Sequence, residues 1–295
     1  MRARTGVYGA NAKVLHMPQA MDPAVLGRAE LVEISGPDAI AFAQALLASD
    51  VASLDVGTWQ WSAWLNAQGR TRAVFALLRI ASDRLLLWLP LGDARATSDA
   101  LSRFVLRAKA KVAVVDGLSV HSLDVRELMP SPFAVALHAN GHAIALPGVA
   151  PRVAWIGPAN SDHADASALA AWRVADIDAR LPWIDVATRD EFVPQALELD
   201  KLGAVRFDKG CYPGQEIAAR LHFRGGNKQR LQRVVLSGEA DAAPGLAILG
   251  ATGTVGTVLY AARSTTSRIE ALAVIAESAL DDSSLTTSAS HIVTI

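Results

Sequence analysis

The order of strand-like and helical segments in the first part of the chain constrains the fold more than any other sequence feature. Leu31–Ile34 has the pattern of a strand, and Pro37 fits the first position of the helix that follows it. Trp59 and Trp61 alternate as strand residues do, and the turn signal Ala-Gln-Gly-Arg at 67–70 separates this strand from the next. Further segments complete the order strand–helix–strand–strand–helix–strand, which predicts an α+β domain with an antiparallel sheet.

The pattern begins again, in weaker form, in the middle of the chain. A hairpin with Asn140-Gly141 at its turn comes first, and a mostly helical segment then runs until Pro182. After about Lys228 the chain changes to short β-rich segments separated by Gly, Pro, Ser and Asp, which is typical of a small antiparallel barrel. The sequence therefore predicts an irregular start over 1–29, two α+β lobes at roughly 30–119 and 120–228 within a region 1–228, and a C-terminal β-barrel at 229–295.

Composition and charge argue against several classes of partner. The 295 residues are 51% hydrophobic with a formal net charge of -1, which gives no electrostatic reason to expect a membrane or a direct nucleic-acid partner. The longest apolar run, Leu85–Leu91, is too short to span a bilayer, and the N-terminus lacks the apolar core of a secretory signal. The single cysteine cannot form an internal disulfide or hold a cluster alone. We therefore expect a cytoplasmic protein without a metal site of its own.

That single cysteine, Cys211, lies in a turn among polar and small residues. Pro213 can open a helix from Gly214 to Leu221, which places Cys211 just before a helix N-terminus. The positive end of the helix dipole stabilises a thiolate there, and Lys209 adds a positive neighbour. Composition alone leaves both a functional thiol and an inert turn residue open. Cys–His catalysis would also need a histidine, and nothing in the sequence places His222 beside the thiol.

The block Phe192–Leu231 resembles the signature region of the YgfZ family of folate-binding proteins. That family shares its fold with the T-protein of the glycine cleavage system, a tetrahydrofolate-dependent aminomethyltransferase. The Phe223–Lys228 segment, Phe-Arg-Gly-Gly-Asn-Lys, also matches the family pattern. The positions that match the family's cysteine motif are Lys209, Gly210, Cys211, Tyr212, Gly214, Gln215 and Glu216, followed by Arg220.

This resemblance implies a fold and a role. The fold is two interleaved α+β lobes and a C-terminal antiparallel β-barrel around a central opening. The implied protein is cytoplasmic, binds tetrahydrofolate or another reduced folate, and supports the assembly or repair of iron–sulfur enzymes, including tRNA-thiolating ones. Its partners would then be the small-molecule folate and iron–sulfur client proteins, and Cys211 would be the functional thiol.

The resemblance also implies a folate site in which this sequence departs from the pattern. The fold carries a pterin-binding acid in a segment Ile-Glu-Ala-Gly, and the matching stretch here is Ile177 to Arg180. Asp178 would pair with the pterin through two parallel hydrogen bonds. Arg180 would compete for Asp178 or reach the glutamate tail; the alternative is a helix-end Asp beside a solvated Arg. The face of Trp61 could stack on folate, although core packing is the commoner use of strand tryptophans.

The second departure concerns the transferase chemistry. The aminomethyltransferases carry an essential aspartate in the hairpin of the first lobe, and the matching residue here is Asn66. An amide cannot act as a general base or balance positive charge as a carboxylate does. We therefore expect an accessory protein rather than a metabolic enzyme. A tetrahydrofolate-dependent aminomethyl or one-carbon transferase and a folate-free interaction module, with Asp178 and Arg180 as an internal ion pair, remain the alternatives.

A run of basic residues follows the cysteine motif. It is open to interpretation as a phosphate-binding strip or, more simply, as a charged connector before the barrel. Its members are Arg220, Arg224, Lys228, Arg230 and Arg233.

Overall fold

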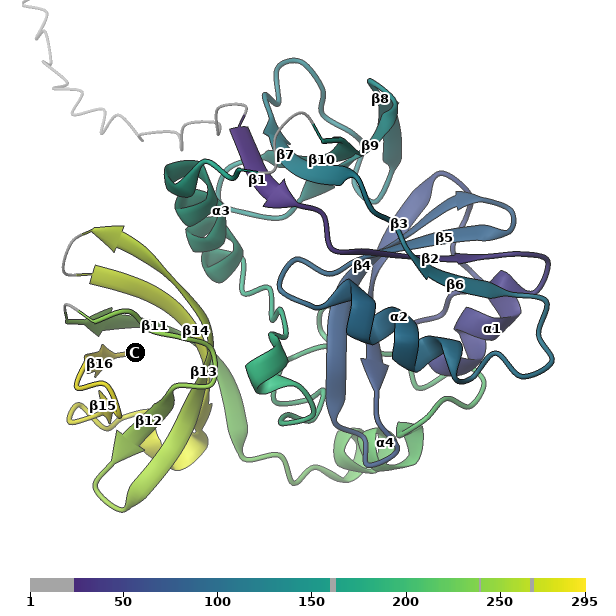
Figure 1. The fold of residues 1–295 in the computed structure, drawn as a ribbon. Coiled ribbons are helices and arrows are strands. Elements are labelled where there is room, and N and C mark those ends of the chain that lie inside the picture. Colours follow the sequence, from purple (N-terminus) through teal and green to yellow (C-terminus); the bar gives the residue numbers. More distant parts are fainter. Residues whose placement is uncertain (1–23, 160–162, 239, 266–267) are drawn as a thin grey trace, which may run out of the picture.

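The computed structural model describes residues 24–159, 163–238, 240–265 and 268–295, which form two sheet-containing lobes and a barrel (Figure 1). The α+β class, the interleaved lobes and the C-terminal barrel are confirmed. Among the described residues, no helix is long and apolar enough to cross a membrane.

The first lobe is a five-stranded antiparallel sheet with two helices against one face. Its strands lie in the order β3-β4-β5-β2-β6. The turn predicted at 67–70 does join two paired strands, β3 and β4. The elements are β2 (Leu31–Ser35), α1 (Ala39–Leu46), β3 (Thr58–Leu65), β4 (Thr71–Ala81), β5 (Arg84–Trp88), α2 (Ala94–Ser102) and β6 (Lys111–Val114).

Both faces of this sheet are buried, which explains the uninterrupted apolar run in β5. Leu85 and Leu87 pack in the core formed with α1 and α2. Leu86 and Trp88 point to the opposite face, into a core shared with the rest of the molecule. A strand buried on both faces needs no polar alternation, so the run carries a strand signal without period two.

The second lobe is a five-stranded sheet in the order β1-β7-β10-β9-β8. Its first strand comes from the start of the described chain, directly before β2 of the first lobe, so the two lobes are interleaved. The expectation of an irregular start is wrong for this strand, whose pairing is interrupted by a register shift between Val25 and Gly27. Residues 1–23 lie outside the described part of the chain. The strands are β1 (Ala24–Arg28), β7 (Leu118–Leu123), β8 (Val135–His138), β9 (Gly141–Leu146) and β10 (Arg152–Pro158).

The hairpin predicted at Asn140-Gly141 is present between β8 and β9, with its turn shifted by one residue. His138 pairs with Gly141, so the two-residue loop is Ala139-Asn140. These residues have φ angles of 44° and 61°. Positive φ at both loop positions is the geometry that matches the twist of the two strands.

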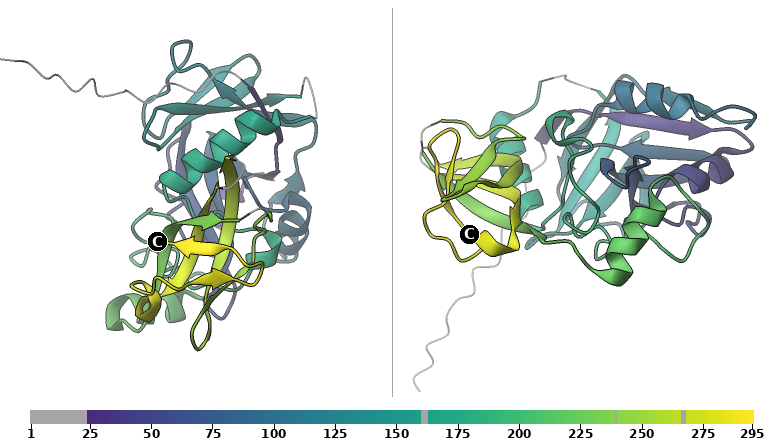
Figure 2. Two further views of the ribbon diagram at one scale, coloured as in Figure 1. Left: turned by 90° about the vertical axis from the view of Figure 1, so that its left-hand side faces the viewer. Right: turned by 90° about the horizontal axis from the view of Figure 1, so that it is seen from below.

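The C-terminal strands close into a barrel in the order β11-β14-β13-β12-β15-β16. Helix α3 (Ala166–Asp178) lies between this barrel and the sheet of the second lobe, as the left view of Figure 2 shows. The barrel strands are β11 (Gln229–Ser237), β12 (Ala247–Gly250), β13 (Gly253–Thr265), β14 (Arg268–Ala276), β15 (Thr286–Thr287) and β16 (Ile292–Thr294), with a short helical turn η2 (Glu277–Ala279) after β14. Another short helical turn, η1 (Val186–Thr188), lies outside the barrel in the segment that follows α3.

One apolar core joins all three parts. Trp61 of the first lobe, Val120 of the second and Tyr260 of the barrel belong to the same cluster of buried side chains. The segment between α3 and α4 (Gln215–Arg224) contributes Trp183 and Phe192 to it. The core therefore fixes the chain that carries the cysteine motif against both lobes.

Candidate functional site

Cys211 is exposed in the turn that leads into α4, the helix at the lower edge of the first lobe in Figure 1. The helix start predicted after Pro213 is confirmed, with Gly214 as the N-cap residue and the helix continuing to Arg224. Cys211 therefore lies beside the N-terminal end of a helix, where the backbone dipole favours negative charge.

Lys209 anchors this turn to the first lobe. Its Nζ donates hydrogen bonds to the backbone oxygens of Gln44, Leu47 and Ser49, at 2.6, 2.7 and 2.8 Å. These carbonyls lie at and just after the C-terminal end of α1, which attracts a cation. Burial lowers the pKa of Lys209 to about 8, so the ammonium form still predominates at neutral pH and uses all three protons. The Lys209 ammonium therefore holds the turn in place, and its protons are not available to hydrogen-bond the thiolate of Cys211.

Tyr212 and Gln215 hold the turn from inside. The buried Tyr212 donates its hydroxyl proton to the backbone oxygen of Arg206 at 3.0 Å. The Lys209 ammonium lies 5.2 Å from the centroid of the Tyr212 ring, within the range of a cation–π contact. Gln215 Nε2 reaches the backbone oxygen of Lys209 at 3.4 Å. Three of the motif side chains therefore order the backbone around Cys211.

Gly214 packs directly against the hairpin turn that contains Asn66. Its φ angle is +78°, and a Cβ atom there would lie 2.3 Å from the backbone oxygen of Asn66 and 2.8 Å from Cα of Gly69. Only glycine allows this approach of two backbones. The structure thus brings together Asn66 and the cysteine motif, which are far apart in the sequence.

An open groove of about 530 Å³ runs beside the thiol. It is lined by Cys211, by Ala67 of the hairpin, and by the first turns of α4, including Glu216 and Ile217. Arg220 is exposed one turn further along α4. His222 is at the other end of the helix, stacked on Phe207 and 3.4 Å from a carboxylate oxygen of Asp200. The arrangement presents an accessible thiol without a histidine base beside it.

Asn66 is hydrogen-bonded to a carboxylate, that of Asp190, which no sequence pattern predicted to lie there. Its Nδ2 donates to Asp190 Oδ1 at 2.9 Å, while its Oδ1 accepts from the backbone of Gln68 and Arg70. Arg72 Nε also donates to Asp190, at 3.1 Å. Asp190 has a φ angle of 62° and lies 124 residues after Asn66, so no local pattern pointed to this pair.

Asp178 and Arg180 attach the end of α3 to the barrel. Asp178 accepts a hydrogen bond from Arg233 Nε on β11 at 2.7 Å. Arg180 bonds to the backbone oxygen of Leu231 and pairs with Glu198. The alternative of an internal ion pair between Asp178 and Arg180 is not observed, because each residue has a different partner.

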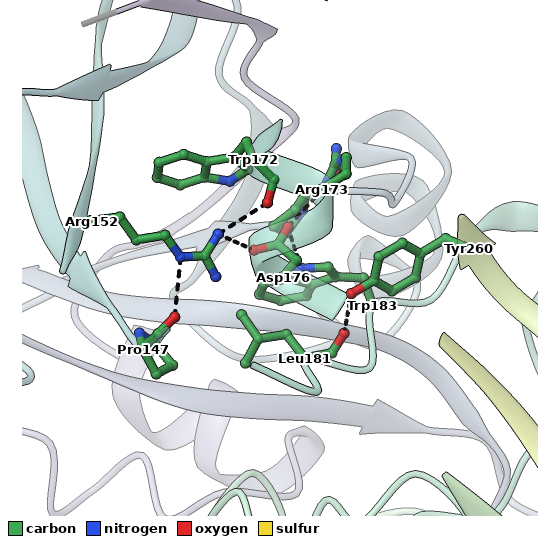
Figure 3. Close-up of polar contacts among 9 residues, drawn as sticks. Pro147, Arg152, Trp172, Arg173, Asp176, Leu181, Trp183 and Tyr260 are labelled. Carbon is green, nitrogen blue, oxygen red and sulfur yellow. Dashed lines mark hydrogen bonds and ion pairs between the residues drawn. The ribbon is translucent and has the colours of Figure 1, made fainter. Parts of the chain in front are cut away.

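The buried carboxylate near this point is Asp176, which sequence reasoning missed (Figure 3). Its Oδ1 lies 2.7 Å from Arg152 Nη1, and both side chains are 1% exposed. Its Oδ2 accepts from Trp183 Nε1 at 3.1 Å and lies 3.3 Å from Arg173. The Arg152 guanidinium also covers the ring of Trp172, at 4.8 Å from the centroid.

The side chains assigned to folate from the sequence do not form one site. Trp61 is buried against Trp59 and Trp183, at centroid distances of 4.8 and 5.4 Å, so the core interpretation of Trp61 fits. Asn66 lies beside the cysteine motif in the turn between β3 and β4, whereas α3, which ends in Asp178, is against the barrel (Figure 1). Because each of these polar groups already has an internal partner, this set does not fit a bound pterin.

Comparisons with known proteins identify relatives. The chain is 30% identical to the tRNA-modifying protein YgfZ of Cronobacter sakazakii over 238 residues, covering 73% of this chain and 71% of that protein. It is 31% identical to the tRNA-modifying protein YgfZ of Edwardsiella ictaluri over 234 residues, covering 72% and 70%. An uncharacterized protein of Haemophilus influenzae is 29% identical over 205 residues, covering 68% and 69%. No protein-family model matches the chain.

The fold has a solved counterpart. The glycine cleavage system aminomethyltransferase T of Bartonella henselae superposes with a TM-score of 0.67, covering 95% of this chain and 85% of that one, at 14% sequence identity. At this identity the likeness concerns the fold alone. The sequence relatives, which share about 30% of their residues over more than two thirds of their length, decide the family: this chain belongs to the YgfZ family.

Proposed function

We propose that this protein is a cytoplasmic accessory protein that supports the assembly or repair of iron–sulfur enzymes, including tRNA-thiolating ones, with Cys211 as its functional thiol. The observation that carries the proposal is the exposed thiol on an ordered turn, held by Lys209, Tyr212 and Gly214. The ammonium of Lys209, the hydroxyl of Tyr212 and the backbone contact of Gly214 thus order a turn whose thiol is exposed. The relatives' name, tRNA-modifying protein, agrees with a role in tRNA thiolation.

The thiol would act with a partner. One thiolate cannot hold an iron–sulfur cluster alone, and the described residues contain no group of three or more possible metal ligands. Cys211 therefore serves as a reactive thiol or as one ligand of a cluster whose remaining ligands come from a client. Its exposure in the groove beside α4 supports access by another protein.

Replacing Cys211 by Ser should abolish the role while leaving the fold intact. The side chain is exposed, so the thermal midpoint should stay within about 2 °C of the wild type, as for surface changes of less than about 0.5 kcal/mol. In a cell that lacks the wild-type gene, the variant should fail to restore the activity of iron–sulfur enzymes. Full restoration of those activities by the variant would rule out the thiol's role.

A reduced folate is the small-molecule ligand that we include in this proposal, on the strength of the family and of its shared fold with an aminomethyltransferase. The polar residues assigned from the sequence do not fit it, so no chemical step is assigned to folate here. Asn66 carries an amide, and the neighbouring Asp190 carboxylate is bound by Arg72 and by Asn66 itself. This arrangement favours the accessory role over aminomethyl transfer.

Anaerobic calorimetry tests the folate part separately. We expect tetrahydrofolate to bind the wild type, and we expect Asp178→Ala to keep its Kd within about threefold, less than 1 kcal/mol, because Asp178 is already engaged by Arg233. A loss of tenfold or more would place the pterin at Asp178 and contradict our interpretation of that residue. If the wild type binds no reduced folate, the protein is a folate-free interaction module and the role of Cys211 stands on the cell experiment alone.

A further inference from the structure

Helix α4 carries a large apolar side chain that is mostly exposed. Phe223 is 74% exposed near the end of this ten-residue helix, whereas Ile217 is 40% exposed and packs against Gly69 of the β3-β4 turn. A solvated surface helix normally carries polar residues on its outer face. In the view from below, α4 lies in the open beside the first lobe (Figure 2).

The same helix carries cations without partners. Arg220 and Arg224 are four residues apart, share one face, and have no ion pair among the described residues. The other arginines of this basic run are neutralised, since Arg230 pairs with Glu277 and Arg233 pairs with Asp178 and Glu270. These ion pairs fit the interpretation of a charged connector for Arg230 and Arg233. Arg220 and Arg224 on α4, in contrast, have no oppositely charged partner among the described residues.

A second groove, of about 370 Å³, lies at the C-terminal end of α4. Its aromatic part is formed by Phe207, His222 and Phe223, with His222 stacked on Phe207 at 4.4 Å and Phe223 5.9 Å from Phe207. The carboxylates of Asp200 and Asp208 also line it, together with Arg206, which pairs with Asp208 at 2.6 Å. Rings beside charged groups of both signs are suited to an amphipathic side chain of another protein.

We propose that the outer face of α4, with the two grooves at its ends, is the docking surface for the iron–sulfur client; this inference rests on the proposed function. The partner is a protein that presents an apolar side chain to the aromatic groove and carboxylates to Arg220 and Arg224. Because Arg206 pairs with Asp208 in the aromatic groove and His222 lies beside Asp200, that groove offers no excess positive charge to a phosphate, which favours a protein partner over a nucleic acid. Aromatic and arginine side chains are those that carry most of the energy in protein interfaces.

A typical protein interface is wide enough to reach from the aromatic groove to Cys211. A helix of ten residues is about 15 Å long. A stable protein interface covers about 800 Å² on each partner, a patch roughly 30 Å across. A client centred on α4 would therefore cover the aromatic groove at one end and Cys211 at the other.

Binding measurements with a purified tRNA-thiolating iron–sulfur enzyme of the same cell test the proposal. We expect Phe223→Ser and the double variant Arg220→Glu/Arg224→Glu each to raise the Kd for the enzyme tenfold or more under anaerobic conditions. Leu137→Ser is the matched control, because Leu137 is 81% exposed on β8 of the second lobe and should change the Kd less than twofold. All these changes are at exposed positions, and unchanged thermal midpoints confirm that the variants are folded.

Three results would overturn the docking surface. One is wild-type affinity in both α4 variants. Another is no measurable binding of the wild type to the enzyme. The third is a loss of affinity for an unpaired RNA oligonucleotide with no loss for the enzyme, which would make α4 a nucleic-acid surface. Failure of the proposed function has a different signature, because Cys211→Ser would then restore iron–sulfur enzyme activity in cells.

Discussion

Gly214→Ala is expected to lower the free energy of unfolding by about 2–5 kcal/mol and to disorder the turn that carries Cys211. An L residue at a φ angle of +78° costs about 1–2 kcal/mol. The new methyl group would also lie 2.3 Å from the backbone oxygen of Asn66 and 2.8 Å from Cα of Gly69. These are backbone atoms of a packed hairpin, so relieving the contact displaces a whole turn, at about 1–3 kcal/mol more.

Gly210→Ala is the matched control, since Gly210 lies in the same motif and a Cβ there would have no atom within 4 Å. Its thermal midpoint should stay close to that of the wild type. The Gly214 variant should melt roughly 4–20 °C lower, at about 2–4 °C per kcal/mol for a chain of this size. Equal thermal midpoints for the two variants would show that Gly214 is not in close contact with the backbone of the β3-β4 turn.

Asp176→Leu is expected to cost about 3–5 kcal/mol, because it leaves the Arg152 guanidinium buried without a counter-charge. Arg152 would keep only carbonyl partners, Pro147 at 3.1 Å and Trp172 at 3.2 Å. The indole N–H of Trp183 would also lose its acceptor. Thermal or urea unfolding of the purified variant measures this loss.

The double variant Arg152→Met/Asp176→Leu separates a lost charge partner from lost packing. It should recover most of the stability lost in Asp176→Leu, because apolar replacement of a whole buried pair is often neutral. Asp116→Ala is the exposed control. Its ion pair with Arg28 is more than half exposed on both sides and should contribute less than about 1 kcal/mol. If Asp176→Leu were as mild as Asp116→Ala, the buried pair would have no special role.

Local features of the fold could be predicted from the sequence because they depend on neighbours along the chain. The hairpin around Gly69, the helix after Pro213 and the barrel after Lys228 each follow from turn chemistry or from strand length. The cysteine motif was likewise visible in one continuous stretch.

The remaining features depend on contacts between distant segments. Nothing near Asp176 distinguishes it from Asp178; burial against Arg152 and Trp183 selects it, and only the tertiary structure supplies that burial. The same holds for Asp190 beside Asn66. The family pattern pointed to Asp178 because the pattern records position, whereas the chemistry of a carboxylate depends on what surrounds it.

The three bonds of Lys209 have a consequence for when the thiol becomes available. The nearest of the three carbonyls belongs to a residue 160 positions earlier, so the bonds close a loop of more than half of the chain. We expect such a contact to form late, after α1 and its following loop have their final shape. An ordered Cys211 turn is thus expected only where the first lobe is complete. Under the proposed function, an incomplete chain would not present its thiol to a client in the same form.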